Sequence, residues 1–267
     1  MIYIYDIKNI NKKILQNKNI ISLKNLKVNQ NFDLVIISTS SEERYKVFYQ
    51  LTKYNRVKKI IFEKFIYFKN SEFLKTSQIL RKKKIKAWVN CMRREIDVMS
   101  NIKSQLSNKF EMIYKNSRWG LGCNSIHFLD LFIFFSKRKN IKISKYHLDK
   151  KIYNSKRKGY VEFKGKILFD NDGSKLLIED NPKNKKKIFI IKTKNKLFSF
   201  SKFENILTIK NLINNSVKKF NSEKPNVSEL SYKIIKKLIN NKKIKLSTFE
   251  DTMVPLKLLI NLFSKHC

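Results

Sequence analysis

Hydrophobic residues in the first third of the chain fall into short runs separated by longer polar stretches with helical periodicity. The runs predict four buried β-strands, at residues 1–6, 32–39, 57–62 and 85–90. Ser41 precedes two glutamates, which is typical of a capped helix that begins after the second strand. Val- and Ile-rich strands that alternate with helices indicate a parallel, doubly wound sheet. We therefore expect a Rossmann-type α/β domain at the front of the chain.

Polar residues follow each of these predicted strands. In doubly wound sheets, ligands bind at the carboxyl ends of the strands. The candidates for such a site are Asp6, Ser38, Thr39, Ser40, Glu63, Lys64 and Asn90.

Beyond about residue 110 the pattern changes to shorter runs separated by turn signals. Strand-like runs occur at residues 160–163, 166–169, 176–179 and 188–191, with Asn171-Asp-Gly173 as one intervening turn. They predict an open, mainly antiparallel sheet with one covered face. Helical periodicity at 227–238 and 249–262 predicts two closing helices. We expect an α/β domain at 1–95 and an α+β domain at 96–267, with the closing helices packing on the first domain.

The net charge is strongly positive. Lys and Arg number 59 against 21 acidic residues, a formal charge of +38, which favours nucleic acid or an anionic membrane as a partner. The chain has one alanine, 5 glycines and 3 prolines, however, as expected from an AT-rich coding bias that also enriches lysine. The lysines are dispersed along the chain, so a nucleic-acid partner is not the favoured prediction.

Three cysteines, Cys91, Cys123 and Cys267, stand far apart without a CxxC pair. This spacing indicates neither a disulfide framework nor a zinc site, and it fits a reducing cytoplasm. The start of the sequence has no signal-peptide pattern, and the apolar run at 126–135 is too short to span a bilayer. We expect a soluble cytoplasmic protein without a metal.

Five sequence segments occur in an order typical of one enzyme family: Asp6, Asp33-Leu-Val-Ile-Ile-Ser-Thr-Ser40, Ile60-Ile-Phe-Glu-Lys64, Asn90-Cys-Met-Arg-Arg94 and Gly122-Cys-Asn-Ser-Ile-His-Phe-Leu-Asp130. In this order and spacing the chain resembles the glucose-fructose oxidoreductase and inositol dehydrogenase family. The resemblance implies a dinucleotide-binding domain joined to an open-sheet domain, with hydride transfer between NAD or NADP and a sugar or polyol carbon.

The resemblance also implies roles for individual residues. Lys64 and His127 would be catalytic, with the imidazole as acid/base on the substrate hydroxyl, a role that suits a pKa near 6.5. Asp6 would bind the adenosine ribose, and residues 38–40, Glu63 and Asn90 would line the cofactor. Substrate contacts would come from Arg93, Arg94, Cys123, Asn124 and Asp130. An acid at position 6 favours NAD, although Lys8 could offset this preference.

The chain departs from the family pattern at three places. Phe65 stands where the family has proline after the Glu-Lys pair, and Cys123 replaces an aspartate four residues before the histidine. No glycine occurs before Gly120, so the Gly-rich phosphate loop of a dinucleotide fold is missing. We interpret this as the absence of roughly 30 residues, about one strand-loop-helix unit, from the front of the domain. The cause would be either a true start upstream or a decayed copy.

Three functions remain open at this point. The first is an NAD(P)-dependent oxidoreductase for a sugar, amino sugar or nucleotide sugar in bacterial surface-polysaccharide synthesis, an expectation that comes from the resemblance. The second is a non-catalytic relative that serves as a sugar-binding or structural subunit. The third is a basic nucleic-acid-binding protein. The resemblance further implies a homo-oligomer formed through the open sheet.

Overall fold

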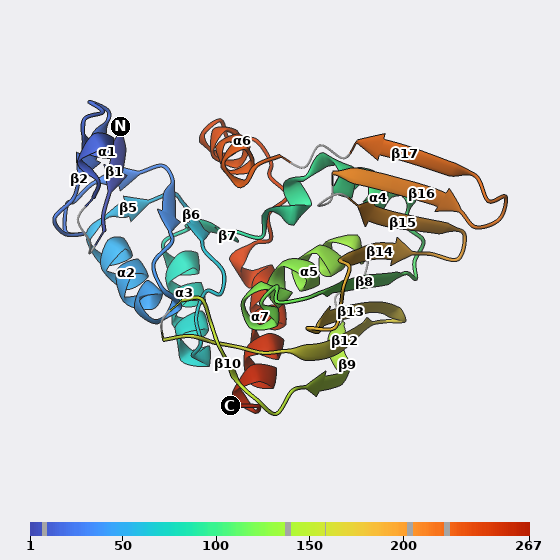
Figure 1. The fold of residues 1–267 in the computed structure, drawn as a ribbon. Coiled ribbons are helices and arrows are strands. Elements are labelled where there is room, and N and C mark those ends of the chain that lie inside the picture. Colours follow the sequence, from blue (N-terminus) through green and yellow to red (C-terminus); the bar gives the residue numbers. More distant parts are fainter. Residues whose placement is uncertain (7–9, 137–139, 158, 202–204, 222–224) are drawn as a thin grey trace. The chain divides into compact units, whose positions relative to one another are not determined.

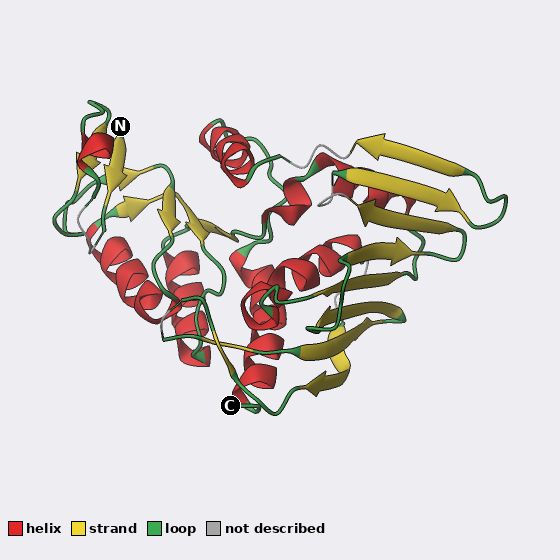
Figure 2. Ribbon diagram, viewed as in Figure 1, coloured by secondary structure: helices red, strands yellow, loops and turns green. Residues whose placement is uncertain are grey.

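The computed structural model describes the chain apart from residues 7–9, 137–139, 158, 202–204 and 222–224. The chain divides into two compact units, Met1–Trp88 and Val89–Cys267. Figures 1 and 2 show the elements of each unit. Among the described residues, no helix has the length and apolarity needed to cross a bilayer.

The first unit consists of short parallel strands and three helices. In chain order these are β1 (Ile2–Ile4), α1 (Lys12–Leu15), β2 (Ile20–Ser22), β3 (Asn31–Phe32), β4 (Val35–Ile37), α2 (Ser41–Tyr54), β5 (Arg56–Val57), β6 (Lys59–Phe62), α3 (Asn70–Lys82) and β7 (Lys86–Val89). Strands β4, β6 and β7 form one sheet, while β3 pairs with β5 and β1 with β2. These pairs confirm the predicted parallel arrangement, because β1–β2, β3–β5 and β4–β6 are all parallel.

Burial of aromatic side chains explains why helices follow these strands. Phe48 of α2 and Phe62 of β6 are fully buried, with ring centroids 5.5 Å apart. Phe73 of α3 is likewise buried and meets the Tyr67 ring edge-on at 5.3 Å. Full burial of an aromatic ring contributes on the order of 1.5–3 kcal/mol, so these contacts fix the helices on the sheet.

Strand β2 was not predicted from the sequence. It is only three residues long, and two of the three are exposed, so its apolar signal is lost in a polar stretch. Its register with β1 pairs Ile2 with Ile20 and Ile4 with Ser22. The first strand thereby gains a hydrogen-bonded neighbour that the sequence pattern alone did not indicate.

The second unit is built on an eight-stranded sheet. Its helices are η1 (Met92–Glu95), α4 (Asp97–Gln105), α5 (Leu121–Phe135), α6 (Val227–Ile239) and α7 (Phe249–Ser264). The sheet contains β8 (Glu111–Asn116), β9 (Ile141–Leu148), β12 (Gly165–Asn171), β13 (Ser174–Asp180), β14 (Ile188–Lys192), β15 (Lys196–Ser201), β16 (Ile206–Asn211) and β17 (Val217–Asn221). A separate small hairpin pairs β10 (Tyr153–Asn154) with β11 (Val161–Glu162).

The strand order is β17-β16-β15-β14-β8-β13-β12-β9, and the neighbours are antiparallel except β8 and β13. Buried and half-exposed residues alternate along the central strands, as in Met112, Ile113 and Tyr114 of β8. Helices α5 and α7 lie on the buried face (Figure 1). The predicted fold class, a Rossmann-type parallel sheet followed by an open, mainly antiparallel sheet with flanking helices, is confirmed.

Candidate functional site

The first unit brings two predicted cofactor segments together. Residues 38–40 directly follow β4, and Glu63 and Lys64 directly follow β6. The two strands are parallel with Ile37 opposite Phe62, and the Glu63 amide donates a 3.0 Å hydrogen bond to the Ile37 carbonyl. Both segments therefore leave the sheet at the same edge, as the strand pattern predicts.

Two further details mark this edge of the sheet. The peptide bond between Lys64 and Phe65 is cis. The Thr39 hydroxyl oxygen is buried and has no hydrogen-bond partner within the described part of the chain. Buried polar groups are normally hydrogen-bonded, so Thr39 is an unsatisfied group at the predicted cofactor position.

Strand pairing does not join Asp6 to these residues. It is exposed, two residues beyond the end of β1, and β1 pairs with β2 alone among the described strands. An edge-on ring contact of 5.5 Å between Tyr3 and Phe32 joins β1 to the strand that precedes β4. Lys8 lies outside the described residues.

Arg44 joins the two cofactor segments. This α2 residue is 1 % exposed, and its guanidinium donates hydrogen bonds to the carbonyl oxygens of Thr39, Phe65 and Ile66. Ser41 donates a 2.7 Å hydrogen bond to the same Phe65 carbonyl. The sequence pattern misses this contact, because Arg44 looks like an ordinary charged residue on a surface helix.

In the second unit, α5 positions four of the predicted residues. Cys123 is exposed, Asn124 and His127 are half-buried, and Asp130 is buried. Cys123 and His127 are four residues apart, so they share a helix face. Cys123 is the most accessible of the four, and His127, the predicted acid/base residue, lies one turn after it on the same face.

Asp130 and Arg94 form a buried ion pair. The Arg94 Nε lies 2.7 Å from the Asp130 Oδ2, and the same guanidinium donates a 2.9 Å hydrogen bond to the Asp130 carbonyl. Burial raises the pKa of Asp130, while the charge of Arg94 and hydrogen bonds from Arg94 and Ser247 oppose this rise. The pair ties η1 to α5. A contact of Arg94 or Asp130 with substrate remains a prediction.

Arg93 and Asn90 also belong to the second unit. The Arg93 guanidinium carbon lies 4.3 Å from the centre of the ring of Phe128, the residue that follows His127. Asn90 is half-buried and directly follows β7. The structure thus places Asn90, Arg93 and the α5 residues in one unit, and Asp6, residues 38–40, Glu63 and Lys64 in the other.

Two carboxylates hold the amino end of α5. Asp180 accepts hydrogen bonds from the amides of Arg118, Trp119 and Gly120, and burial raises its pKa against the lowering effect of these bonds. Glu162 accepts from the amides of Gly122 and Cys123 at 2.8 and 3.2 Å. A Cβ atom on Gly122 would come within 2.8 Å of the Glu162 carboxylate, and Gly120 has a φ of 78°. The sequence pattern does not indicate these partners.

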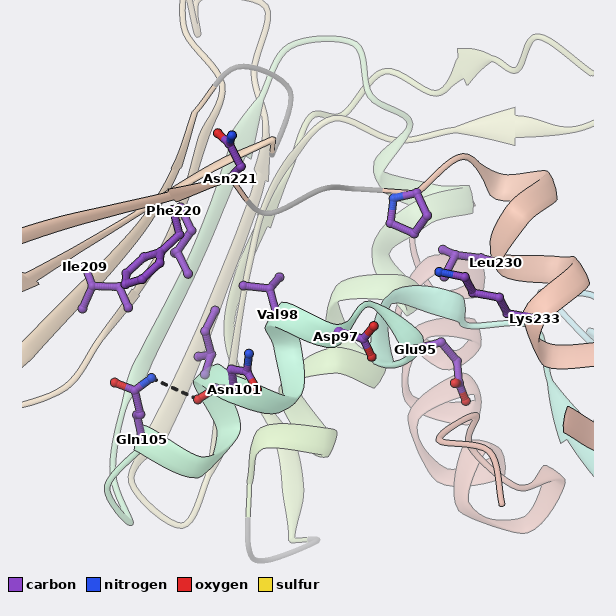
Figure 3. Close-up of a pocket in the computed structure, with 13 residues that line it drawn as sticks. Glu95, Asp97, Val98, Asn101, Gln105, Ile209, Phe220, Asn221, Leu230 and Lys233 are labelled. Carbon is purple, nitrogen blue, oxygen red and sulfur yellow. Dashed lines mark hydrogen bonds between the residues drawn. The ribbon is translucent and has the colours of Figure 1, made fainter. Parts of the chain in front are cut away.

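A cavity of about 360 Å³ lies elsewhere in the second unit. Figure 3 shows its apolar wall, which includes Ile209 and Phe220 of the sheet, opposite Asp97 and Lys233. None of the residues predicted for cofactor, substrate or proton transfer lines this cavity. In the described part of the chain, no group of three or more His, Cys, Asp or Glu side chains could hold a metal ion.

No family model and no curated protein matches the chain by sequence. Solved structures share its fold, and several are oxidoreductases. A dehydrogenase (MviM) from Clostridium difficile has a TM-score of 0.73 at 16% identity, over 95% of this chain and 86% of that one. An oxidoreductase from Agrobacterium radiobacter, in complex with NAD+, L-tartaric acid and magnesium, gives 0.63 at 14% identity, over 85% and 76%.

The transcriptional regulator Gal80p from Kluyveromyces lactis has the same fold, with a TM-score of 0.72 at 14% identity over 99% of this chain and 84% of that one. The fold predicted from the resemblance is therefore confirmed. Because the same fold carries both oxidoreductases and a regulator, the fold does not select between the two kinds of function.

The Arg94–Asp130 pair gives a direct test of what holds the second unit. We expect Arg94→Met or Asp130→Leu alone to lower the free energy of unfolding by about 3–5 kcal/mol, because each leaves a buried charge without its partner. The double variant should lose less than the sum of the single losses, since it removes both charges. Urea unfolding of the four proteins measures this coupling, and strictly additive losses would contradict it.

Proposed function

We propose that this chain is an NAD(P)-dependent oxidoreductase acting on a hydroxyl-bearing carbon of a sugar, amino sugar or nucleotide sugar. The observation that carries the proposal is the meeting of residues 38–40 with Glu63 and Lys64 at one edge of a parallel sheet. That edge is where doubly wound folds bind ligands. A protein of the same fold was solved with NAD+.

The local chemistry supports a nucleotide at this edge. Thr39 carries a buried hydroxyl without a partner in the described residues, which a bound ligand or water would satisfy after a side-chain rotation. Asp6 is exposed and acidic, as required to accept hydrogen bonds from ribose hydroxyls, and an acid there disfavours a 2′-phosphate.

The reaction divides between cofactor and protein. A bound nicotinamide would supply hydride transfer. Oxidation of an alcohol carbon also releases the hydroxyl proton, and His127 would take this proton at one ring nitrogen. Lys64, at the edge of the first unit's sheet, would supply an ammonium that stabilises negative charge developing on a substrate oxygen.

Substrate contacts would come from the first half of α5 and from Arg93. Asn124 offers an amide to sugar hydroxyls, and Arg93 offers a guanidinium to a carboxylate or phosphate on the substrate. Cys123 stands where the resemblance implies an aspartate, so it removes an acceptor for a hydroxyl. A role in surface-polysaccharide synthesis would follow from a substrate of this class.

A non-catalytic role is the second candidate. Cys123 in place of an aspartate favours it, as does the shared fold with a transcriptional regulator. The two candidates differ in nucleotide binding and turnover, which are both measurable.

Nucleotide binding is the first test. We expect the purified chain to bind NADH with micromolar affinity and a stoichiometry near one, followed by fluorescence of the reduced nicotinamide. Asp6→Ala should weaken binding by about tenfold or more, because it removes a charged hydrogen-bond acceptor. Asp33→Ala is the matched control, since Asp33 is an exposed acid of the same unit that pairs with Lys58 at 2.8 Å. Absence of NADH and NADPH binding would overturn the proposal in favour of the non-catalytic role.

Turnover tests the role of His127. With a sugar or polyol oxidised by the wild-type chain and NAD+, His127→Asn should lower kcat by about a hundredfold or more, because the proton acceptor is lost. The affinity for NADH should stay unchanged. His147→Asn is the control, because His147 is exposed on β9. Equal kcat in the wild-type and His127→Asn proteins would remove His127 from the reaction.

The half-exposed face of the eight-stranded sheet supports a homo-oligomer. Four apolar residues lie in register across adjacent strands: Leu168, Leu177, Ile113 and Ile190. All four are half-buried. Acidic residues interleave with lysines in the next row, where Glu111 lies between Lys175 and Lys192. This mixture fits another protein surface better than a polyanion such as nucleic acid.

A charge in the apolar row tests the oligomer. We expect the wild-type chain to elute as a dimer or larger assembly, and Ile190→Glu to shift it to the monomer, because a buried unpaired carboxylate is costly at an interface. Light scattering after size exclusion measures the mass. Ile213→Glu is the control, since Ile213 is 72% exposed in the turn after β16. A monomeric wild type, or an Ile190→Glu variant of unchanged mass, would contradict the proposed interface.

A further inference from the structure

We infer that Arg44 is a positioning residue that couples the loop after β4 to the loop after β6. The position of a nucleotide bound at residues 38–40 and the position of the Lys64 side chain would then depend on each other. The functional meaning of this coupling rests on the proposed function, but the coupling itself is a property of the first unit.

The contacts of Arg44 span the two loops. One terminal nitrogen donates to the Thr39 carbonyl, in the loop after β4. The other donates to the carbonyls of Phe65 and Ile66, in the loop after β6, at 3.0 Å for Ile66. Thr39 adjoins the predicted nucleotide contacts, and Phe65 adjoins Lys64. A single planar group therefore fixes the distance between the two backbones next to the predicted site residues.

The position of Arg44 makes the coupling rigid. Its guanidinium is buried in the first turn of α2, so the cost of desolvating the charge is offset only while the carbonyl acceptors stay in place. Ser41, the first residue of α2, donates to the Phe65 carbonyl as well. Beyond Ile66, the buried Tyr67 ring packs on Phe62 and Phe73 and anchors the far end of the loop.

The other end of α2 offers a matched control. Asn55 is 7% exposed and donates hydrogen bonds to the carbonyls of Leu26 and Leu51, at 2.7 and 2.9 Å, while it accepts one from the Gln30 amide. It therefore resembles Arg44 as a buried side chain that bonds to loop backbone. Its contacts lie with residues 26–30, and none of them belongs to the predicted site.

The test compares Arg44→Met, Arg44→Lys and Asn55→Ala in the full chain. We expect Arg44→Met and Asn55→Ala both to lower the thermal midpoint. Only Arg44→Met should weaken NADH binding, by about tenfold, because it releases the loop that carries residues 38–40. Arg44→Lys should recover part of the affinity, since an ammonium can reach some of the carbonyls but lacks the planar fork. NADH affinity in Arg44→Met equal to that of the wild type, or a loss matched by Asn55→Ala, would overturn the inference.

Hydrogen exchange separates this inference from the proposed function. In Arg44→Met, backbone exchange should rise together in residues 38–41 and 63–67, whereas Asn55→Ala should raise it in residues 26–31. This readout needs no nucleotide. If the wild type fails to bind NADH, the proposed function fails, and the coupling is judged by exchange alone. Faster exchange in only one of the two loops of Arg44→Met would show that Arg44 does not couple them.

Discussion

One buried guanidinium holds the edge of the first unit where the cofactor is predicted to bind. Short parallel strands align the start of each loop, but they do not control the path of the chain beyond the last ladder hydrogen bond. Arg44 supplies that control, because its donors bind the carbonyls of Thr39, Phe65 and Ile66 together. A buried arginine costs free energy unless its donors are satisfied, so the loops and the side chain stabilise each other. The positions of residues 38–40 and Lys64 depend on this mutual arrangement.

In the second unit, carboxylates position the backbone in a similar way. Asp180 and Glu162 accept hydrogen bonds from the amides that precede and begin α5, where the helix dipole favours negative charge. Asp130 fixes the middle of the helix through Arg94. These contacts set the rotation and the starting point of α5, and so determine that Cys123 is exposed and that Asn124 and His127 are half-buried. In both units, charged side chains position the backbone segments that carry the residues predicted for cofactor binding and catalysis.

Much of the fold could be predicted from the sequence because its signals are local. The hydrophobic runs that became β4, β6 and β7 end within two residues of their predicted ends, and the turn at Asn171-Asp-Gly173 separates β12 from β13. The sequence places residues 38–40 and Glu63 correctly at strand ends for the same reason. Arg44, Glu162 and Asp180 could not be found this way. Apart from the Thr39 carbonyl, which is 5 residues from Arg44, their backbone partners lie 21 to 62 residues away in the chain, and a charged residue carries no local sign that its environment is buried.

The positioning contacts also explain why the fold persists while its chemistry can change. Arg44, the Arg94–Asp130 pair and the carboxylates at α5 bond to backbone or to each other, so they keep the architecture independent of any bound ligand. Cys123, by contrast, stands where the resemblance implies an aspartate, at a position predicted to meet a substrate. A likeness at 16% identity thus reports on the scaffold, and a regulator and a dehydrogenase can share it. The side chains predicted to meet a ligand, at residues 38–40, Lys64 and His127, are the positions at which two proteins of this fold can differ in chemistry.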